Sequence, residues 1–271
     1  PTKGDCPRLR HAWWTHKDQN SEGHAFLCAE APWIGYKSVG QASSRPANRF
    51  DKCGRNILLF REIYLVSIEG TQSYKMSFST GGLFVNESIE VAKLHRDDET
   101  WKQTITRALE EGAASLPKAA SQRRTLREIA NRVSTLSSDE LAFLIEDADR
   151  QEQQSILWLA TCRAYRFVRE FAVEVIREKY LSYQMDLPLE SFDIFYNAKA
   201  EWDDGLAEIS KSTQLKLRQI MFRMMREAGV ISEDNQIQTA YLTPRLKLMI
   251  EEHNAAELAV FPGISYEGAS A

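Results

Sequence analysis

The sequence has few cysteines that could form disulfide bonds and no long apolar run that could cross a membrane. Only four cysteines occur in 271 residues, which favours a reducing compartment over a disulfide framework. No apolar run reaches the roughly 20 residues of a membrane-spanning helix. The best candidate, ILLFREIYLVSI at 57–68, is interrupted by Arg61 and Glu62. We therefore expect a soluble, cytoplasmic protein with no membrane contact.

Motifs for catalysis, metals and nucleotides are also missing. The segment 77–88, SFSTGGLFVNES, has two glycines before a helix start, but it matches neither GxGxxG nor GxxxxGK[ST]. Such a loop can point N–H groups at an anion, although a flexible entry turn is the alternative. His95 and His253 have no neighbouring nucleophile or metal ligand, and the cysteines and histidines before residue 57 fit no zinc spacing. We expect no enzymatic activity, metal or cofactor.

Positive charge is scarce overall but unevenly distributed. The formal net charge is −4, so the chain is not a general polyanion binder. Residues 1–73 carry 10 Lys/Arg and 7 Asp/Glu, and the remaining residues carry 24 and 31. Any surface for nucleic acid must therefore be a local patch on an acidic body.

The beginning of the chain lacks a helical or extended period. Residues 1–56 are rich in Gly, Pro, Ser and Asn, and GQASSRPANR is typical of a linker. We expect residues 1–73 to form a disordered or non-native leader, residues 74–262 a helical domain and residues 263–271 a flexible tail.

Beyond residue 74, apolar residues recur at helical spacing and predict an all-α, globular multi-helix bundle. Ser137 and Glu140 suit a capping box, and Thr243 followed by Pro244 is a typical helix start. The expected helices cover residues 86–96, 98–112, 121–136, 137–149, 151–182, 190–202, 213–228 and 243–253.

The 151–182 helix is predicted to be central, because residues 157–181 are apolar over most of the circumference. One stripe is charged and comprises Arg163, Arg166, Glu170, Glu174 and Arg177. Alternating signs at this spacing indicate a ladder of ion pairs. Arg163 has no acidic partner within the stripe, which makes it a candidate for binding an anion.

Residues 229–243, GVISEDNQIQTAYLT, contain two short β-like runs around a polar turn. A helix followed by a small hairpin is the arrangement of a winged helix. An ordinary connection between helices is the alternative.

Two helices carry basic faces. The 121–136 helix groups Arg123, Arg124, Arg127 and Asn131, and the 213–228 helix groups Lys216, Gln219, Arg223 and Arg226 without an intervening acid. Phosphate contacts supply the sequence-independent part of nucleic-acid affinity. We therefore predict that DNA, or otherwise RNA, binds to Arg123, Arg124, Arg127, Arg163, Lys216, Arg223 and Arg226. Solvated helix faces are the alternative.

A second hypothesis is a scaffold that assembles partner proteins without contacting nucleic acid. The segment DIFYNAKAEW offers Phe195, Tyr196 and Trp202 for docking, because exposed aromatic residues mark interaction surfaces. Packing of these residues in the core is the alternative.

Several long segments together resemble one known family, the BrxA proteins of bacteriophage exclusion (BREX) phage-defence systems. They are YKMSFSTGGLFVNESIEVAKL, RRTLREIANRVSTLSSDELAFLIE, RQEQQSILWLATCRAYRFVREFAVEVIREKYL, FYNAKAEW and LRQIMFRMMREAGVI. The resemblance runs from about Tyr74 to about Phe261. It implies a native start near Met76 and an all-helical, cytoplasmic protein without known enzymatic activity. Such a protein would act in antiviral defence beside the system's methyltransferase and ATPase, with DNA binding as a suggested role. No catalytic residue carries over.

Overall fold

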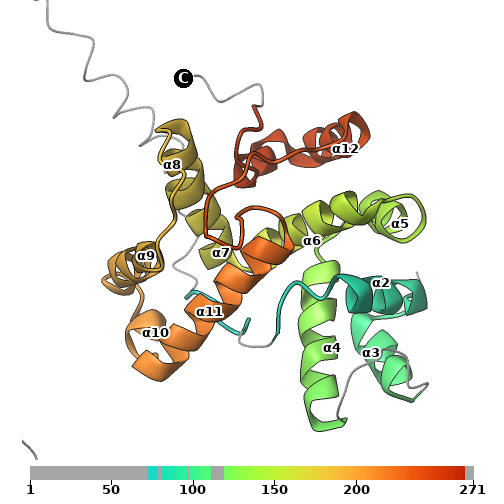
Figure 1. Cartoon of the computed structure of the whole chain (residues 1–271). Coiled ribbons are helices and arrows are strands. Elements are labelled where there is room, and N and C mark those ends of the chain that lie inside the picture. Colours follow the sequence, from blue (N-terminus) through green and yellow to red (C-terminus); the bar gives the residue numbers. More distant parts are fainter. Residues whose placement is uncertain (1–72, 79–80, 97, 111–118, 266–271) are drawn as a thin grey trace, which may run out of the picture. The chain divides into compact units, whose positions relative to one another are not determined.

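The structure, a computed structural model, describes residues 73–78, 81–96, 98–110 and 119–265. The expected leader lies almost entirely outside these residues, as does most of the expected tail. Within the described ranges all regular structure is helical (Figure 1), so the all-α prediction is confirmed.

The helices follow one another closely along the chain. Their bounds are α2 Val85–Leu94, α3 Trp101–Glu110, α4 Ala119–Val133, α5 Ser138–Glu146, α6 Arg150–Ala164, α7 Arg166–Phe171, the π-helix η1 Ala172–Arg177, α8 Glu178–Leu181, α9 Glu190–Ala200, α10 Asp204–Ala207, α11 Lys211–Glu227, α12 Pro244–Asn254 and the 3-10 helix η2 Ala255–Val260.

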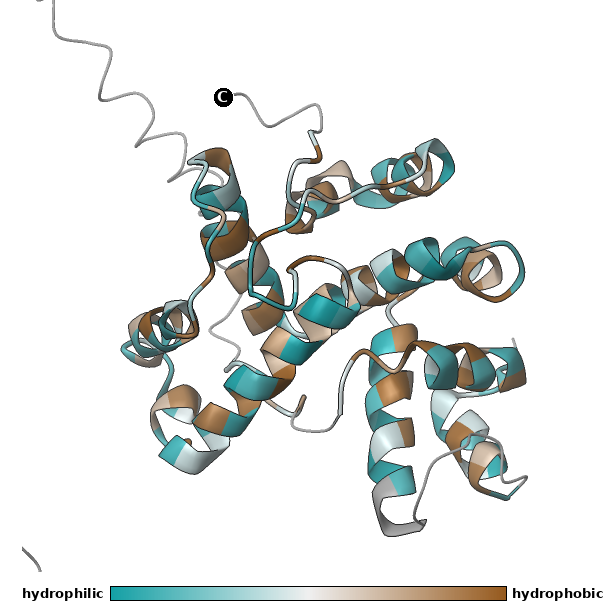
Figure 2. Cartoon of the chain, viewed as in Figure 1, coloured by the Kyte–Doolittle hydropathy of each residue, from teal (hydrophilic) through white to brown (hydrophobic). Residues whose placement is uncertain are grey.

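Helix α6 is the central element of the unit that the described residues form. All eight residues from Ser155 to Cys162 are buried, and the helix packs against α2, α4, α5, α11 and η2. Its neighbours are amphipathic, and Figure 2 shows hydrophilic and hydrophobic residues alternating along them. A helix that is apolar on nearly every side can be stable only when covered on nearly every side.

Side-chain caps fix where several of these helices begin, among them α5, α6 and α12. Ser137 and Glu140 form the predicted capping box of α5, and Thr243 caps α12 ahead of Pro244 at its first turn. A second capping box, Asp149 with Glu152, starts α6. Because each box satisfies otherwise unpaired N–H groups, the short connection from α5 to α6 is sharply defined.

The prediction of one continuous helix over 151–182 is wrong in one respect, because the observed helix breaks at Tyr165. This residue is extended, with φ −130° and ψ 98°. Its hydroxyl donates to Glu128 Oε2 at 2.5 Å, and its ring meets Phe78 edge-on at 5.2 Å. These tertiary contacts hold the kink, and α7 then continues into the π-helix η1.

Aromatic packing joins α7 to α9. Phe167 contacts Phe192, Phe195 and Tyr196 at centroid distances of 5.2–5.9 Å. Phe195 and Tyr196 are therefore core residues, and the hypothesis that they dock a partner is wrong. Trp202 differs, since it is 86% exposed.

The predicted winged hairpin is not confirmed. Val230, Ile231 and Ile237 pack into the core, and a single antiparallel bridge joins Ile231 to Ile237. The tip between them exposes Glu233 and Asp234, whose charge is unfavourable for a wing that contacts phosphate.

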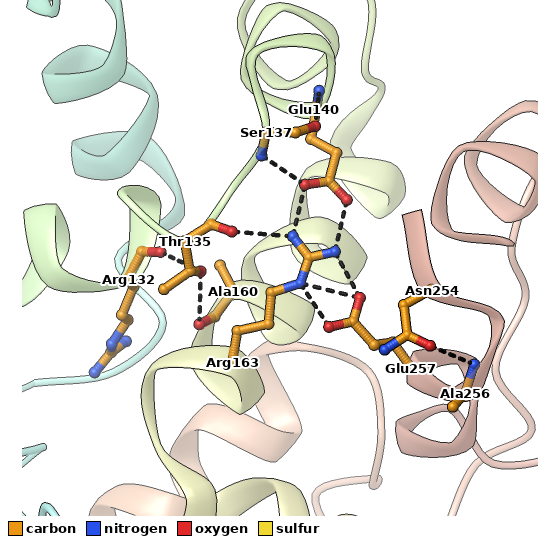
Figure 3. A network of polar contacts seen from close by, with 9 residues as sticks. All are labelled: Arg132, Thr135, Ser137, Glu140, Ala160, Arg163, Asn254, Ala256 and Glu257. Carbon is orange, nitrogen blue, oxygen red and sulfur yellow. Dashed lines mark hydrogen bonds and ion pairs between the residues drawn. The ribbon is translucent and has the colours of Figure 1, made fainter. Parts of the chain in front are cut away.

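Arg163 ties four elements together (Figure 3). Its guanidinium bonds Glu140 on α5 at 2.6 Å, Glu257 on η2 at 2.6 Å and the Thr135 carbonyl after α4 at 3.1 Å. The side chains of Arg163 and Glu140 are only 9% and 1% exposed. The prediction that Arg163 is available to bind an anion is wrong, because acidic partners from other helices already hold its guanidinium.

The network also determines how Glu140 titrates. Burial opposes ionisation of this carboxyl, but hydrogen bonds from Arg163 and the Ser137 N–H outweigh it and hold the pKa of Glu140 below its ordinary value of 4.5. A carboxyl whose pKa is lowered by folding stabilises the fold when the pH is above its pKa in the unfolded state. This stabilisation is lost as the pH falls through its pKa in the folded state.

We predict that Glu140→Gln lowers the free energy of unfolding at pH 7 by about 3 kcal/mol, because it leaves a buried guanidinium short of charge. Below pH 4.5, which is the ordinary pKa of a glutamate carboxyl, the difference in unfolding free energy between variant and wild type should shrink. Urea denaturation across a pH series measures both effects. Glu251→Gln, which breaks the more exposed Lys247–Glu251 pair, should cost less than about 1 kcal/mol; an equal cost for the two variants would contradict the network.

Candidate nucleic-acid interface

Helix α4 presents three arginines to solvent. Arg123, Arg124 and Arg127 are exposed, whereas Leu126 and Ile129 on the opposite side are fully buried. No ion pair joins any of the three to another residue in the described ranges. We call these three residues the α4 ridge.

A hollow of about 650 Å³, here called the cationic hollow, lies between the ridge and the segment 73–78. It is lined by Lys75, Ser77, Arg123, Arg124, Arg127, Glu128 and Asn131. The volume falls within the roughly 300–1,000 Å³ of ordinary ligand sites. Four cations therefore surround one concave surface.

The one carboxylate of this hollow is already neutralised. Glu128 pairs with the buried Arg132 at 2.7 Å and accepts the Tyr165 hydroxyl. Arg132 is held in turn by the Gly82 carbonyl at 2.8 Å. Burial and the nearby Glu128 raise the pKa of Tyr165 above its ordinary range, so the phenol stays a donor. The net charge facing the hollow is positive.

A second hollow of about 420 Å³, here called the aromatic hollow, lies on the other side of the ridge. Helices α3 and α4 form it, and its lining is Trp101, Lys102, Ile105, Thr106, Leu109, Arg123, Arg127, Ala130, Asn131 and Ser134. Arg123 and Arg127 line both hollows. The ridge thus separates a polar cationic surface from a partly apolar one.

The predicted α11 residues are placed differently. Lys216 is exposed and has no ion-pair partner among the described residues. Arg223 pairs with Glu227 at 2.7 Å, so the expectation that no acid interrupts this face is wrong. Arg226 donates a hydrogen bond to Asn235 Oδ1 at 2.8 Å and forms an ion pair with Glu233 at 3.7 Å. Both arginines have acidic neighbours that compete with phosphate.

Neither the cationic hollow nor the aromatic hollow is lined by a cation of α11. Arg223 lines another depression of about 270 Å³ with Glu227, Glu87 and Arg150. Of the seven predicted residues, the structure brings together Arg123, Arg124 and Arg127, and Arg163 is fixed inside its own network. The roles of these residues in binding stay predictions.

Sequence reasoning missed Lys75. This lysine precedes the first described helix and belongs to no periodic pattern, so only the fold brings it to α4. Its ammonium donates to Asn131 Oδ1 and lies 5.7 Å from the centroid of the Tyr165 ring. Lys102 was missed because it belongs to no basic face on α3, and the packing of α3 on α4 places it at the aromatic hollow.

The described part of the chain holds neither a cluster of metal ligands nor a membrane-spanning helix. No group of three or more His, Cys, Asp or Glu residues there is arranged to hold a metal ion. None of the described helices is long and apolar enough to span a bilayer.

Comparison with known proteins gives one family. The sequence model of BrxA matches residues 72–254. The BREX protein BrxA of Escherichia coli O9:H4 (strain HS) is 26% identical over 185 residues, which cover 66% of this chain and 84% of that protein. Among solved structures, an uncharacterized protein from Magnetospirillum magneticum has a TM-score of 0.59 at 19% identity, covering 70% of this chain and 98% of that one. The last likeness concerns the fold alone.

We predict that the ridge arginines contribute nothing to stability. Arg124→Ala combined with Arg127→Ala should change the free energy of unfolding by less than about 0.5 kcal/mol, because both side chains are solvated. Arg163→Ala should cost about 3–5 kcal/mol, because it leaves Glu140 buried without a counter-charge. Urea denaturation of the full chain measures the difference, and a costly ridge variant would show that these arginines are structural.

Proposed function

The chain belongs to the BrxA family and is thus a BREX phage-defence protein, and from this premise we propose that it binds DNA through the α4 ridge as a non-enzymatic accessory protein of the cytoplasm. The observation that carries the proposal is the convergence of Arg123, Arg124, Arg127 and Lys75 on one hollow without a competing free carboxylate.

Electrostatics explain why this group is the better candidate. An acidic neighbour reduces the net positive charge that a phosphate meets, and this weakens the attraction between the cation and the phosphate. The ridge arginines have no such partner among the described residues, whereas Arg223 and Arg226 do. Guanidinium groups also bond phosphate oxygens in bidentate fashion. The ridge therefore supports phosphate binding more strongly than α11 does.

We expect the triple change Arg123→Ala, Arg124→Ala and Arg127→Ala to weaken DNA binding and to flatten its dependence on salt. Each lost phosphate contact reduces the slope of log K against log salt by about 0.9 for duplex DNA, so the full change is about 2–3. Fluorescence anisotropy across a salt series measures it. The matched control removes three cations from α11 (Lys216→Ala, Arg223→Ala and Arg226→Ala) and should leave the slope nearly unchanged.

If wild type binds no DNA at low salt, the proposed function is wrong. If the α11 variant loses binding and the ridge variant keeps it, the function stands and the assignment to α4 is wrong.

A second candidate function is the assembly of other BREX components, such as the system's methyltransferase or ATPase. The exposure of Trp202 favours it, because a solvated tryptophan is a typical anchor at protein interfaces. Trp202 lies between α9 and α10, next to Asp203, which caps α10 and accepts from the Tyr74 N–H at 2.9 Å. The corner that carries this side chain is therefore well anchored.

For this candidate we expect Trp202→Ala to weaken binding of a purified methyltransferase or ATPase from the same system by at least about tenfold, with DNA affinity unchanged. Biolayer interferometry measures both. Tyr241→Ala is the control, since Tyr241 is also exposed, at 65%. Equal affinity of wild type and Trp202→Ala for every component would exclude Trp202 as an anchor.

A further inference from the structure

The aromatic hollow adds a property that phosphate contacts alone do not explain. We propose that the ligand of the ridge is a single strand, whose backbone follows Arg123 and Arg127 and one of whose bases enters the aromatic hollow beside Trp101. This inference rests on the proposed function and specifies the form of nucleic acid that the site takes.

The first support is Trp101, an aromatic side chain whose position is fixed by stacking on His95. Trp101 is partly exposed and stacks on His95 with a centroid distance of 3.8 Å and an angle of 6° between the rings. His95 is itself hydrogen-bonded to Thr104 at 2.8 Å. With Ile105 and Leu109, Trp101 gives this hollow its apolar surface. Stacking on such a surface tolerates any base, because every base has a π-face.

The second support is the position of the ridge. Arg123 and Arg127 are one helical turn apart, about 5–6 Å between Cβ atoms, and both line the aromatic hollow. Backbone and base contacts are therefore adjacent. In a duplex the bases are stacked and paired inside, away from the surface that meets the phosphates. A single strand can turn a base out beside its own phosphates.

The third support is Asn131, which lines both hollows. Its Oδ1 accepts from the Lys75 ammonium, and this bond fixes the orientation of the amide. Its Nδ2 is buried and finds no acceptor among the described residues. A buried donor without an acceptor is costly, and this residue lines the hollow that the base would enter. The site thus has a polar group suited to a base edge.

The test compares three probes of equal length, about 20 nucleotides, on the full-length protein. They are a thymidine strand, the same backbone with abasic sites and a duplex. The abasic strand carries the same charge, so phosphate contacts alone predict equal binding of both strands. The proposed base contact predicts that the abasic strand binds about tenfold more weakly and that the duplex binds more weakly than the thymidine strand.

Variants at the platform locate the contact. Trp101→Ala should abolish the preference for the thymidine strand over the abasic strand, with an unchanged salt slope, and Trp101→Phe should restore most of it. Circular dichroism checks that the variants are folded, and the comparison of strands on wild type needs no variant.

The failures of the two proposals can be distinguished. If the abasic and thymidine strands bind equally, or the duplex binds as tightly as the single strand, the base contact is wrong and DNA binding by the ridge stands. If none of the three probes binds, both proposals are wrong.

Discussion

A buried charge must be paired, and this constraint organises the unit around α6. Arg163 and Arg132 are deeply buried, with side chains 9% and 2% exposed. Arg163 binds α5 and η2 to α6, and Arg132 binds the Gly82 carbonyl and Glu128. Removing one partner of such a pair is far more costly than removing a surface pair. The two networks therefore fix α4 and α5 against the central helix.

The same constraint separates the cations that have an acidic partner from those that could bind an external ligand. The buried acids Glu128 and Glu140 pair with Arg132 and Arg163, and on α11 Arg223 pairs with Glu227 and Arg226 lies near Glu233. Among the described residues, the α4 ridge faces solvent and a hollow whose one lining carboxylate, Glu128, is neutralised by Arg132. Because no described residue pairs with these charges, they are available to an external ligand, which is why the proposed function rests on α4.

Local patterns predicted the helices well, whereas contacts between distant segments were not accessible to them. The capping box at Ser137 and the start at Thr243 follow from neighbouring residues alone. The break at Tyr165 does not, because the residues that contact Tyr165, Glu128 and Phe78, come from other segments. The ridge could be predicted from spacing within one helix. The pairing of Arg163 with Glu257 and the approach of Lys75 to Asn131 depend on the tertiary fold.

The acidic character of the chain gives this arrangement a consequence. With a net charge of −4, long-range attraction to nucleic acid is weak, and salt screens it beyond about 10 Å. Affinity must then come from contacts made within the hollows. A site that adds a stacked base to a few phosphates depends less on salt than one built from phosphates alone. The juxtaposition of Trp101 with the ridge is thus what an acidic protein needs in order to hold a polyanion.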